Sequence, residues 1–260
     1  MLLESNPANW MVLDSVPSTN TFALNSDLPP GSVVFAHNQT VGRGRQGRSW
    51  IAQSGDSVIF SGLLEFPVGF VVEQLRLLPL LTGYAVLLAA EDELGCAAEF
   101  SELRERSTLS IKWPNDVYLT RDGTTGKLGG VLVESTFQSG RFRVVLGIGV
   151  NYRGSVPAVS GALVPPAVLF PGRSPANPID SFGVRLIQKL NLLLPELRAG
   201  AMWLKALRQR NYLRDRVVAR GGRNYRVIDF ADTGELLLEA IETGTRISID
   251  DTIEDLVPNI

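Results

Sequence analysis

The segment that most constrains the fold is an almost uninterrupted apolar run at residues 143–151. An apolar run of this length is typical of a strand buried on both faces, so we expect it at the centre of a sheet. Gly147 and Gly149 stand two positions apart and therefore lie on one face of that strand. Because glycine has no side chain, this face leaves room for a flat ligand. Asn151 ends the run, where its carboxamide can donate and accept hydrogen bonds at a pocket mouth.

A second informative segment, residues 41–50, alternates glycine with arginine and closes with Trp50. Glycine lets a backbone approach a ligand closely, and arginine offers a planar, permanently charged set of donors for phosphate or carboxylate oxygens. Disordered basic tails have a similar composition, but they come as long repeats, whereas this run is short and lies between two apolar segments. We interpret it as a mobile loop that folds around an anionic ligand. Its chemistry-bearing residues are Gly42, Arg43, Gly44, Arg45, Gly47 and Arg48.

The glycines of this loop also match the spacing of a dinucleotide-binding turn, G-x-G-x-x-G. That pattern is meaningful only between a strand and a helix. Residues 57–64, which follow the loop, are rich in strand-forming side chains and predict a strand where the motif needs a helix. The sequence therefore disfavours this kind of dinucleotide binding.

Residues 123–128 resemble the end of a P-loop without satisfying it. Arg121 stands where the motif requires a glycine, and Leu128 stands where it requires serine or threonine. We expect instead a hairpin-like turn that delivers Lys127 to a strand at 128–134. Gly129 and Gly130 inside that strand indicate that a ligand or another backbone comes close.

Residues 111–119 favour a strand, yet Trp-Pro-Asn-Asp interrupts them at 113–116. Proline removes a donor from a strand ladder, and asparagine and aspartate prefer turns. A local rule broken in this way often marks a functional site, although a bulged edge strand would have the same sequence.

The remaining segments predict a chain that mixes helices and strands. Apolar periodicity predicts helices at 71–94, 180–197 and 201–212, whereas residues 152–178 form a long Pro- and Gly-rich connection, which is typical of a functional or disordered loop. Beyond residue 213, short strands separated by glycine-containing turns predict a small β-barrel. We therefore expect two domains, 1–213 and 214–260.

Composition bounds the environment and the partners. The chain has 260 residues and a net charge of −2, so its overall charge does not favour bulk attraction to nucleic acid. Cys96 is the sole cysteine, which excludes an intramolecular disulfide and a cysteine metal cluster, and its small apolar neighbours predict a buried thiol.

The N-terminus has no signal-peptide pattern. Arg76, Pro79 and Thr82 interrupt the apolar segment 75–90, which we expect to be a buried helix and not a membrane span. A reducing cytoplasm is the expected location.

Four motifs now stand in one order: Ser-Thr-Asn at 18–20, the Gly/Arg run at 42–50, Lys-Trp-Pro-Asn-Asp at 112–116, and the glycine-containing strands at 127–130 and 147–151. In this order the chain resembles the biotin–protein ligase family, the biotin–[acetyl-CoA-carboxylase] ligases, over essentially its whole length. The resemblance implies an α+β fold, with a mixed sheet and helices on one side as in class II synthetases, and a C-terminal SH3-like β-barrel. It implies that the enzyme forms biotinyl-5'-AMP from biotin and ATP with Mg²⁺. The biotinyl group then passes to a lysine of a biotin carboxyl carrier protein.

The resemblance also implies roles for individual residues. Lys127, Asp116 and Arg45 would be catalytic: Lys127 would stabilise charge in both half-reactions, and Asp116 would orient the acceptor lysine or take its proton. Biotin would contact Ser18, Thr19, Asn20, Gln39, Arg43, Gly44, Arg45, Lys127, Gly130 and Gly149. ATP or the adenylate would contact Arg43, Arg45, Arg48, Trp50, Asn115, Lys127 and Asn151. No metal ligand is identified.

Several alternatives stay open at this point. Lipoate or octanoyl ligases and transferases have a related fold, and a non-catalytic biotin-binding module would keep the pocket without the chemistry. Ser18 follows Met1 so closely that we expect no N-terminal winged helix and no DNA partner. The protein could be a monomer or a homodimer. A short helix capped by residue 18 or 19 would account for the Ser-Thr-Asn segment without any ligand.

Overall fold

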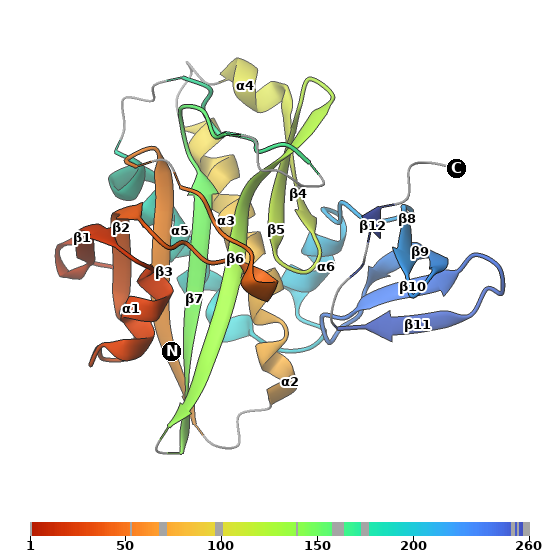
Figure 1. Ribbon diagram of the computed structural model, residues 1–260, viewed down its shortest axis with the longest axis horizontal. Coiled ribbons are helices and arrows are strands. Elements are labelled where there is room, and N and C mark those ends of the chain that lie inside the picture. The colour runs from red at the N-terminus through yellow and green to blue at the C-terminus, as the bar shows by residue number, and fades with distance from the viewer. Residues whose placement is uncertain are drawn as a thin grey trace.

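A seven-stranded sheet forms the centre of the protein in the computed structural model, which describes residues 2–52, 54–67, 72–96, 101–138, 140–157, 164–172, 177–250, 253 and 255–256. The strand order is β1-β2-β3-β7-β6-β5-β4 (Figure 1). Strands β1 and β2 are parallel, and the other neighbouring strands are antiparallel. The strands are β1 (Met11–Val16), β2 (Val33–Gln39), β3 (Ser57–Pro67), β4 (Ser107–Lys112), β5 (Asp116–Arg121), β6 (Thr124–Gln138) and β7 (Arg141–Asn151).

Helices α3 (Leu78–Gly95) and α5 (Val184–Leu193) cover one face of this sheet, and the short helix α1 (Thr19–Asn25) lies on the other face (Figure 1). The helix predicted at 71–94 is interrupted, with α2 (Val72–Leu75) ending before α3 begins. Pro79 in the first turn of α3 explains the break, because it has no N–H to bond the preceding turn. The other helical segments are α4 (Ser101–Glu105), α6 (Met202–Arg208), a π-helix at Ile179–Gly183, and short 3₁₀ turns at Pro7–Asn9, Arg45–Gly47 and Leu194–Glu196.

Strand β7 is the central strand that the apolar run predicts, since it pairs with β3 on one side and β6 on the other. Its residues alternate between two surroundings. Leu146, Ile148 and Val150 belong to the large core under α3 and are almost fully buried. Gly147 and Gly149 point to the opposite face, the one that carries α1.

The Trp-Pro-Asn-Asp segment is neither an interrupted strand nor a bulged edge strand. It is the turn of a hairpin, because β4 and β5 pair with Lys112 opposite Asp116. The turn contains a cis Trp113–Pro114 peptide. The Trp113 side chain is buried, and its Nε1 donates a hydrogen bond of 3.0 Å to the carbonyl oxygen of Gly234.

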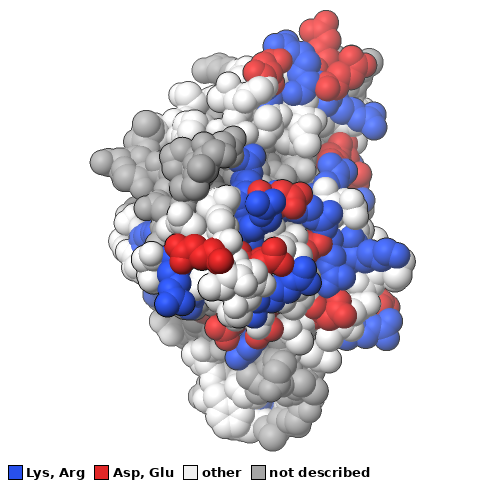
Figure 2. Space-filling view, turned by 90° about the vertical axis from the view of Figure 1, so that its right-hand side faces the viewer, with Lys and Arg blue, Asp and Glu red and all other residues white. Residues whose placement is uncertain are grey.

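The C-terminal part forms a second, antiparallel sheet in the order β11-β10-β9-β8-β12. Its strands are β8 (Val217–Arg220), β9 (Arg223–Phe230), β10 (Leu236–Ala240), β11 (Arg246–Ile249) and β12 (Asp255–Leu256). Basic and acidic side chains intermingle on the side of the molecule that carries this sheet (Figure 2), and Arg246 pairs across strands with Glu239 at 2.8 Å. The prediction of a mixed sheet with a small C-terminal β unit is confirmed; strands β1 and β12 were not predicted, and the boundary at 213 stays a prediction.

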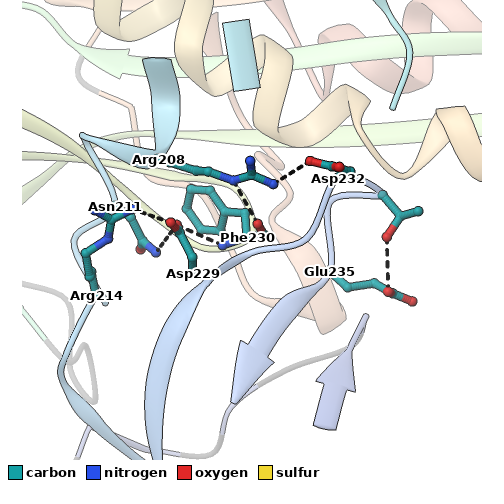
Figure 3. A network of polar contacts seen from close by, with 8 residues as sticks. Arg208, Asn211, Arg214, Asp229, Phe230, Asp232 and Glu235 are labelled. Carbon is teal, nitrogen blue, oxygen red and sulfur yellow. Dashed lines mark hydrogen bonds and ion pairs between the residues drawn. The ribbon is translucent and has the colours of Figure 1, made fainter. Parts of the chain in front are cut away.

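A polar network fastens the second sheet to the segment that precedes it (Figure 3). Arg208 donates to the Phe230 carbonyl at 2.9 Å and to the Asp232 carboxylate at 2.6 Å. Arg214 forms an ion pair with Asp229, which also accepts a hydrogen bond from Asn211. The last turn of α6 and the chain that follows it are therefore tied to β9.

Two further predictions can be compared with the structure. Cys96 is exposed at the end of α3, so the prediction of a buried thiol is wrong. Ala97 and Ala98, on which that prediction partly rested, lie outside the described residues. Within the described part of the chain, no helix is both long and apolar enough to cross a membrane.

Candidate active site

One cavity of about 810 Å³ lies on the face of the sheet opposite α3. Its walls come from α1, the Gly/Arg loop, the β4–β5 turn and the strands β6 and β7. The structure brings all the predicted site residues to this one cavity. They are Ser18, Thr19, Asn20, Gln39, Arg43, Gly44, Arg45, Arg48, Trp50, Asn115, Asp116, Lys127, Gly130, Gly149 and Asn151.

The Ser-Thr-Asn segment forms the start of α1 and is buried. Ser18 is the N-cap, as the helix interpretation predicts, and its hydroxyl accepts a hydrogen bond from the Thr21 N–H at 3.4 Å. The Thr19 N–H donates to Gln39 Oε1 at 2.8 Å. Residues far apart in the sequence are thus joined into one polar wall.

Asn20 is held on several sides. Its Nδ2 donates to the Leu132 carbonyl at 3.1 Å and to Glu134 Oε2 at 2.9 Å. Its Oδ1 accepts a hydrogen bond of 2.6 Å from the buried hydroxyl of Ser61. A methyl group on Gly147 would lie only 2.2 Å from Asn20 Oδ1, so glycine is needed beneath this carboxamide.

The Gly/Arg loop is folded into a small hairpin over the cavity. The Trp50 N–H donates to the Gly42 carbonyl at 2.9 Å, and the Gly44 N–H donates to the Arg48 carbonyl at 2.7 Å. The chain reverses at Gln46 and Gly47, whose φ angles of 55° and 72° lie in the left-handed region that glycine adopts easily. Arg43 of the loop forms an ion pair with Glu134 of strand β6.

Trp50 covers the second glycine of β7. A methyl group on Gly149 would lie 2.3 Å from the indole Cε2, so this glycine admits the ring. The space predicted for a flat ligand above Gly147 and Gly149 is therefore occupied by the side chains of Asn20 and Trp50. Trp50 Nε1 is buried and has no hydrogen-bond partner among the described residues.

Lys127 and Asp116 form the charged centre of the cavity. Lys127 Nζ lies 2.7 Å from Asp116 Oδ1 and 5.9 Å from the centroid of the Trp50 ring. Gly130 lies beneath this pair, since a methyl group there would be 3.3 Å from Lys127 Cε and 3.4 Å from Asp116 Oδ1. Lys112 adds a further cation to this region; burial lowers its pKa, and the nearby Asp116 carboxylate opposes that shift.

Two asparagines also line the cavity. Asn151 Nδ2 donates to the carbonyls of Lys127 and Ala167 at 3.3 and 3.1 Å, whereas its buried Oδ1 has no partner within the described residues. Asn115 Nδ2 donates to the Val131 carbonyl at 2.7 Å, which holds the β4–β5 turn against β6. A buried acceptor without a partner is costly, so Asn151 Oδ1 is suited to receive a donor from a ligand.

Comparison with known proteins decides the family. Residues 12–151 match the model of the "Biotin/lipoate A/B protein ligase family". This chain is a member of that family. The matched range includes every residue of the predicted site.

Individual relatives are consistent with this family match. The chain is 37% identical over 162 residues to a biotin–[acetyl-CoA-carboxylase] ligase of Paracoccus denitrificans, which covers 60% of this chain and 59% of the relative. It is 33% identical over 141 residues to the bifunctional ligase/repressor BirA of Bacillus subtilis (strain 168), covering 54% of this chain and 38% of the relative. The matches thus span 59% and 38% of the lengths of these two curated relatives.

Solved structures show the same fold. The biotin protein ligase of Aquifex aeolicus in complex with biotin and ATP superposes with a TM-score of 0.68 at 22% identity, covering 94% of this chain and 96% of that chain. The biotin protein ligase of Leishmania major in complex with biotinyl-5-AMP gives a TM-score of 0.58 at 19% identity, covering 94% and 99%. The fold predicted from the resemblance is confirmed.

Part of the long connection at 152–178 also borders the cavity. Val156, Val164 and Pro166 line it, and the Lys127 N–H donates to the Pro165 carbonyl at 2.8 Å. Residues 158–163 and 173–176 lie outside the described residues, so the predicted functional or disordered loop is not tested there. Ile253, from the C-terminal part, lines the same cavity.

Sequence reasoning missed three polar residues of the site. Ser61 and Glu134 support Asn20, and Lys112 contributes positive charge although it belongs to a quoted motif. Glu134 lies four positions after Gly130, so strand periodicity places both on the same face. The strand periodicity could therefore have identified Glu134 as a site residue.

Proposed function

We propose that this chain is an ATP-dependent biotin–protein ligase. It would join biotin to the α-phosphate of ATP, releasing pyrophosphate, and pass the biotinyl group from biotinyl-5'-AMP to a lysine of a biotin carboxyl carrier protein. The observation that carries the proposal is the meeting, in one cavity, of a buried polar wall at Ser18–Asn20 with the Lys127–Asp116 pair and the arginine loop. Membership of the family supports it.

The cationic centre suits the first half-reaction. A biotin carboxylate and the phosphates of ATP are both anions, and bringing them together requires positive charge fixed in advance. Arg45, Arg48 and Lys127 line the cavity and can supply it. Asp116 keeps the Lys127 ammonium in place at 2.7 Å, so the charge need not reorganise when the carboxylate oxygen attacks the α-phosphorus.

The same pair suits the second half-reaction. The amine of the acceptor lysine attacks the acyl carbon of the adenylate, AMP leaves, and the amine loses one proton. Asp116 binds Lys127 through Oδ1, and its carboxylate can accept that proton. The hairpin of the Gly/Arg loop would cover the adenylate and exclude water, which otherwise hydrolyses the anhydride.

Two unsatisfied atoms of the cavity wall suit the nucleotide. Asn151 Oδ1 is an acceptor and Trp50 Nε1 a donor, both buried in the cavity wall without partners among the described residues, and an adenylate offers groups of both kinds. Mg²⁺ accompanies ATP and commonly takes one or two protein carboxylates together with phosphate oxygens and waters. Asp116 can provide one such carboxylate, and the described residues contain no group of three or more metal-ligating side chains.

The finer assignments belong to this proposal as well. The partner would be a biotin carboxyl carrier domain, the location the cytoplasm where ATP and that carrier occur, and the assembly a monomer or homodimer. A lipoate or octanoyl ligase is the second candidate, because the family model covers lipoate enzymes. The arginine-rich loop favours biotin.

The test is to mix the purified protein with biotin, Mg-ATP and a biotin carboxyl carrier domain and to weigh the carrier intact. We expect a gain of one biotinyl group on a single lysine, together with biotin-dependent pyrophosphate release. No gain with biotin but a gain with lipoate or octanoate would replace the proposal with the second candidate. No reaction with any of these acids would leave a binding module without catalysis.

A further inference from the structure

Glu134 is an unexpected residue for a site that binds two anions. It lies on β6, on the same face as Gly130, and 23% of its side chain is exposed. A carboxylate here repels the carboxylate and phosphates that the proposed reaction brings into the cavity. The contacts of Glu134 must therefore explain why a carboxylate is found at this position.

Those contacts join two separate parts of the site. Glu134 Oε2 accepts a hydrogen bond of 2.9 Å from Asn20 Nδ2, and Oε1 forms the ion pair with Arg43. Asn20 belongs to the buried wall at the start of α1, whereas Arg43 belongs to the Gly/Arg loop. One side chain thus connects the fixed wall to the loop that covers the cavity.

The contact with Asn20 determines which end of its carboxamide faces which neighbour. The Leu132 carbonyl and an ionised Glu134 only accept hydrogen bonds, so both require the NH₂ end of Asn20. The Oδ1 end is then left to accept from Ser61, with a lone pair remaining for an N–H of a ligand. Glu134 therefore orients Asn20 so that its Oδ1 can accept a hydrogen bond from a ligand.

The contact with Arg43 changes the role expected for the first arginine of the loop. With its charge balanced by Glu134, Arg43 fastens the loop to the sheet. Arg45, Arg48, Lys112 and Lys127 also line the cavity and can supply positive charge to the carboxylate and phosphates.

We propose that Glu134 is a positioning residue that both orients the Asn20 carboxamide as an acceptor for biotin and anchors the Gly/Arg loop through Arg43. The biotin role rests on the proposed ligase function, whereas the loop role does not depend on it.

Limited trypsin digestion of the ligand-free protein tests the loop anchor, because the loop contains three arginines. Glu134→Gln keeps the shape and can still accept from Asn20, but it places an uncharged amide against Arg43. We expect cleavage after residues 43, 45 and 48 to become about tenfold faster, as for the loss of a partly buried charge-assisted contact. Glu65→Gln is the matched control, since Glu65 pairs with Arg141 at 2.8 Å on β3 and β7 and is 20% exposed. It should leave cleavage in the loop unchanged.

Steady-state pyrophosphate release tests the orientation of Asn20. Glu134→Ala removes both contacts, and we expect the KM for biotin to rise about tenfold while kcat changes less than about threefold, because a binding contact is lost and the reacting groups are kept. A double-mutant cycle can use the same KM for biotin. Arg43→Met should change this KM little in the Glu134→Gln background, since both substitutions break the same ion pair.

The outcomes separate the two claims. Loop cleavage and biotin KM both within twofold of wild type would overturn the inference, and so would a fall in kcat with an unchanged KM. A wild-type protein that neither binds nor activates biotin would overturn the ligase function and the biotin role together. The tryptic comparison would then still decide the loop anchor.

Discussion

The two faces of β6 and β7 are built from alternate residues of the same strands, yet they differ in almost every respect. Toward α3, Leu146, Ile148 and Val150 fill a continuous apolar core. Toward the cavity, Gly147 and Gly149 lie beneath the polar side chain of Asn20 and the indole of Trp50. The core face is insensitive to which apolar residue fills it provided that the volume is kept, whereas the cavity face depends on particular atoms. Five substitutions test this difference.

The largest effect is expected at the charged centre of the cavity face. Lys127→Ala removes the ammonium held by Asp116, and biotin-dependent pyrophosphate release should fall by about 10²–10³-fold, as for the loss of one preorganised electrostatic group. Lys205→Ala, at an exposed position of α6, is the control and should change nothing. Near-normal release from the Lys127 variant would show that its proposed role is wrong.

On the core face, a substitution should affect stability and spare the chemistry. Leu146→Ala empties a fully buried position and should lower the free energy of unfolding by about 2–5 kcal/mol. Urea denaturation measures this loss, and the KM for biotin should stay within twofold when assayed where the protein is folded. A large change in KM would mean that the two faces are not independent.

Gly147→Ala tests the neighbouring position on the other face. The added methyl would lie 2.2 Å from Asn20 Oδ1, so Asn20 must move, and we expect the KM for biotin to rise at least about tenfold. Gly95→Ala is a suitable control, because there the methyl meets nothing closer than 3.8 Å. If biotin binds the Gly147 variant normally, Asn20 is not part of its site.

Trp50→Phe keeps a ring over Gly149 but removes the indole N–H that has no partner among the described residues. The expected result is a rise of about threefold in the KM for ATP, consistent with the loss of one neutral hydrogen bond. Isothermal titration with ATP provides an independent reading. Unchanged ATP binding would leave Trp50 as a packing residue only.

The smallest effect is a pH dependence at the pair Ile111 and Lys112, which face the core and the cavity respectively. Burial lowers the pKa of Lys112 in the folded protein, so the cost of burying its charge is fully present below that folded pKa and disappears as pH rises toward the ordinary lysine value. Lys112→Met should therefore stabilise the protein at pH 7, and the gain should shrink by pH 10. Chemical denaturation at the two pH values measures it, and an equal gain at both would contradict the cause given.

The sequence predicted more of the cavity than the contacts within it. The central position of β7 follows from one apolar run, and the glycines in it and in β6 indicated close approach before any neighbour was known. The contacts of Glu134 with Asn20 and Arg43 span 114 and 91 positions, and they depend on strand register, which local patterns do not determine.

The errors have local causes. Strand β1 was missed because its exposed edge mixes Asp14 and Ser15 with apolar residues, which weakens the alternation. The helix at 71–94 was extended through Pro79 because apolar periodicity outweighed the backbone rule. Cys96 was assigned to the core from its neighbours, although the helix ends there.

The hydrogen bond from Trp113 to Gly234 has a consequence for the order in which the protein is made. The turn that carries Asn115 and Asp116 is synthesised well before the residue that accepts the buried indole N–H, 121 positions later. Until that residue leaves the ribosome, the indole lacks this partner, at a cost of about 1–3 kcal/mol if it is already buried. A nascent chain therefore completes this corner of the cavity only after β9 and residue 234 have emerged, and a product stopped before residue 234 would contain Asn115 and Asp116 without this contact.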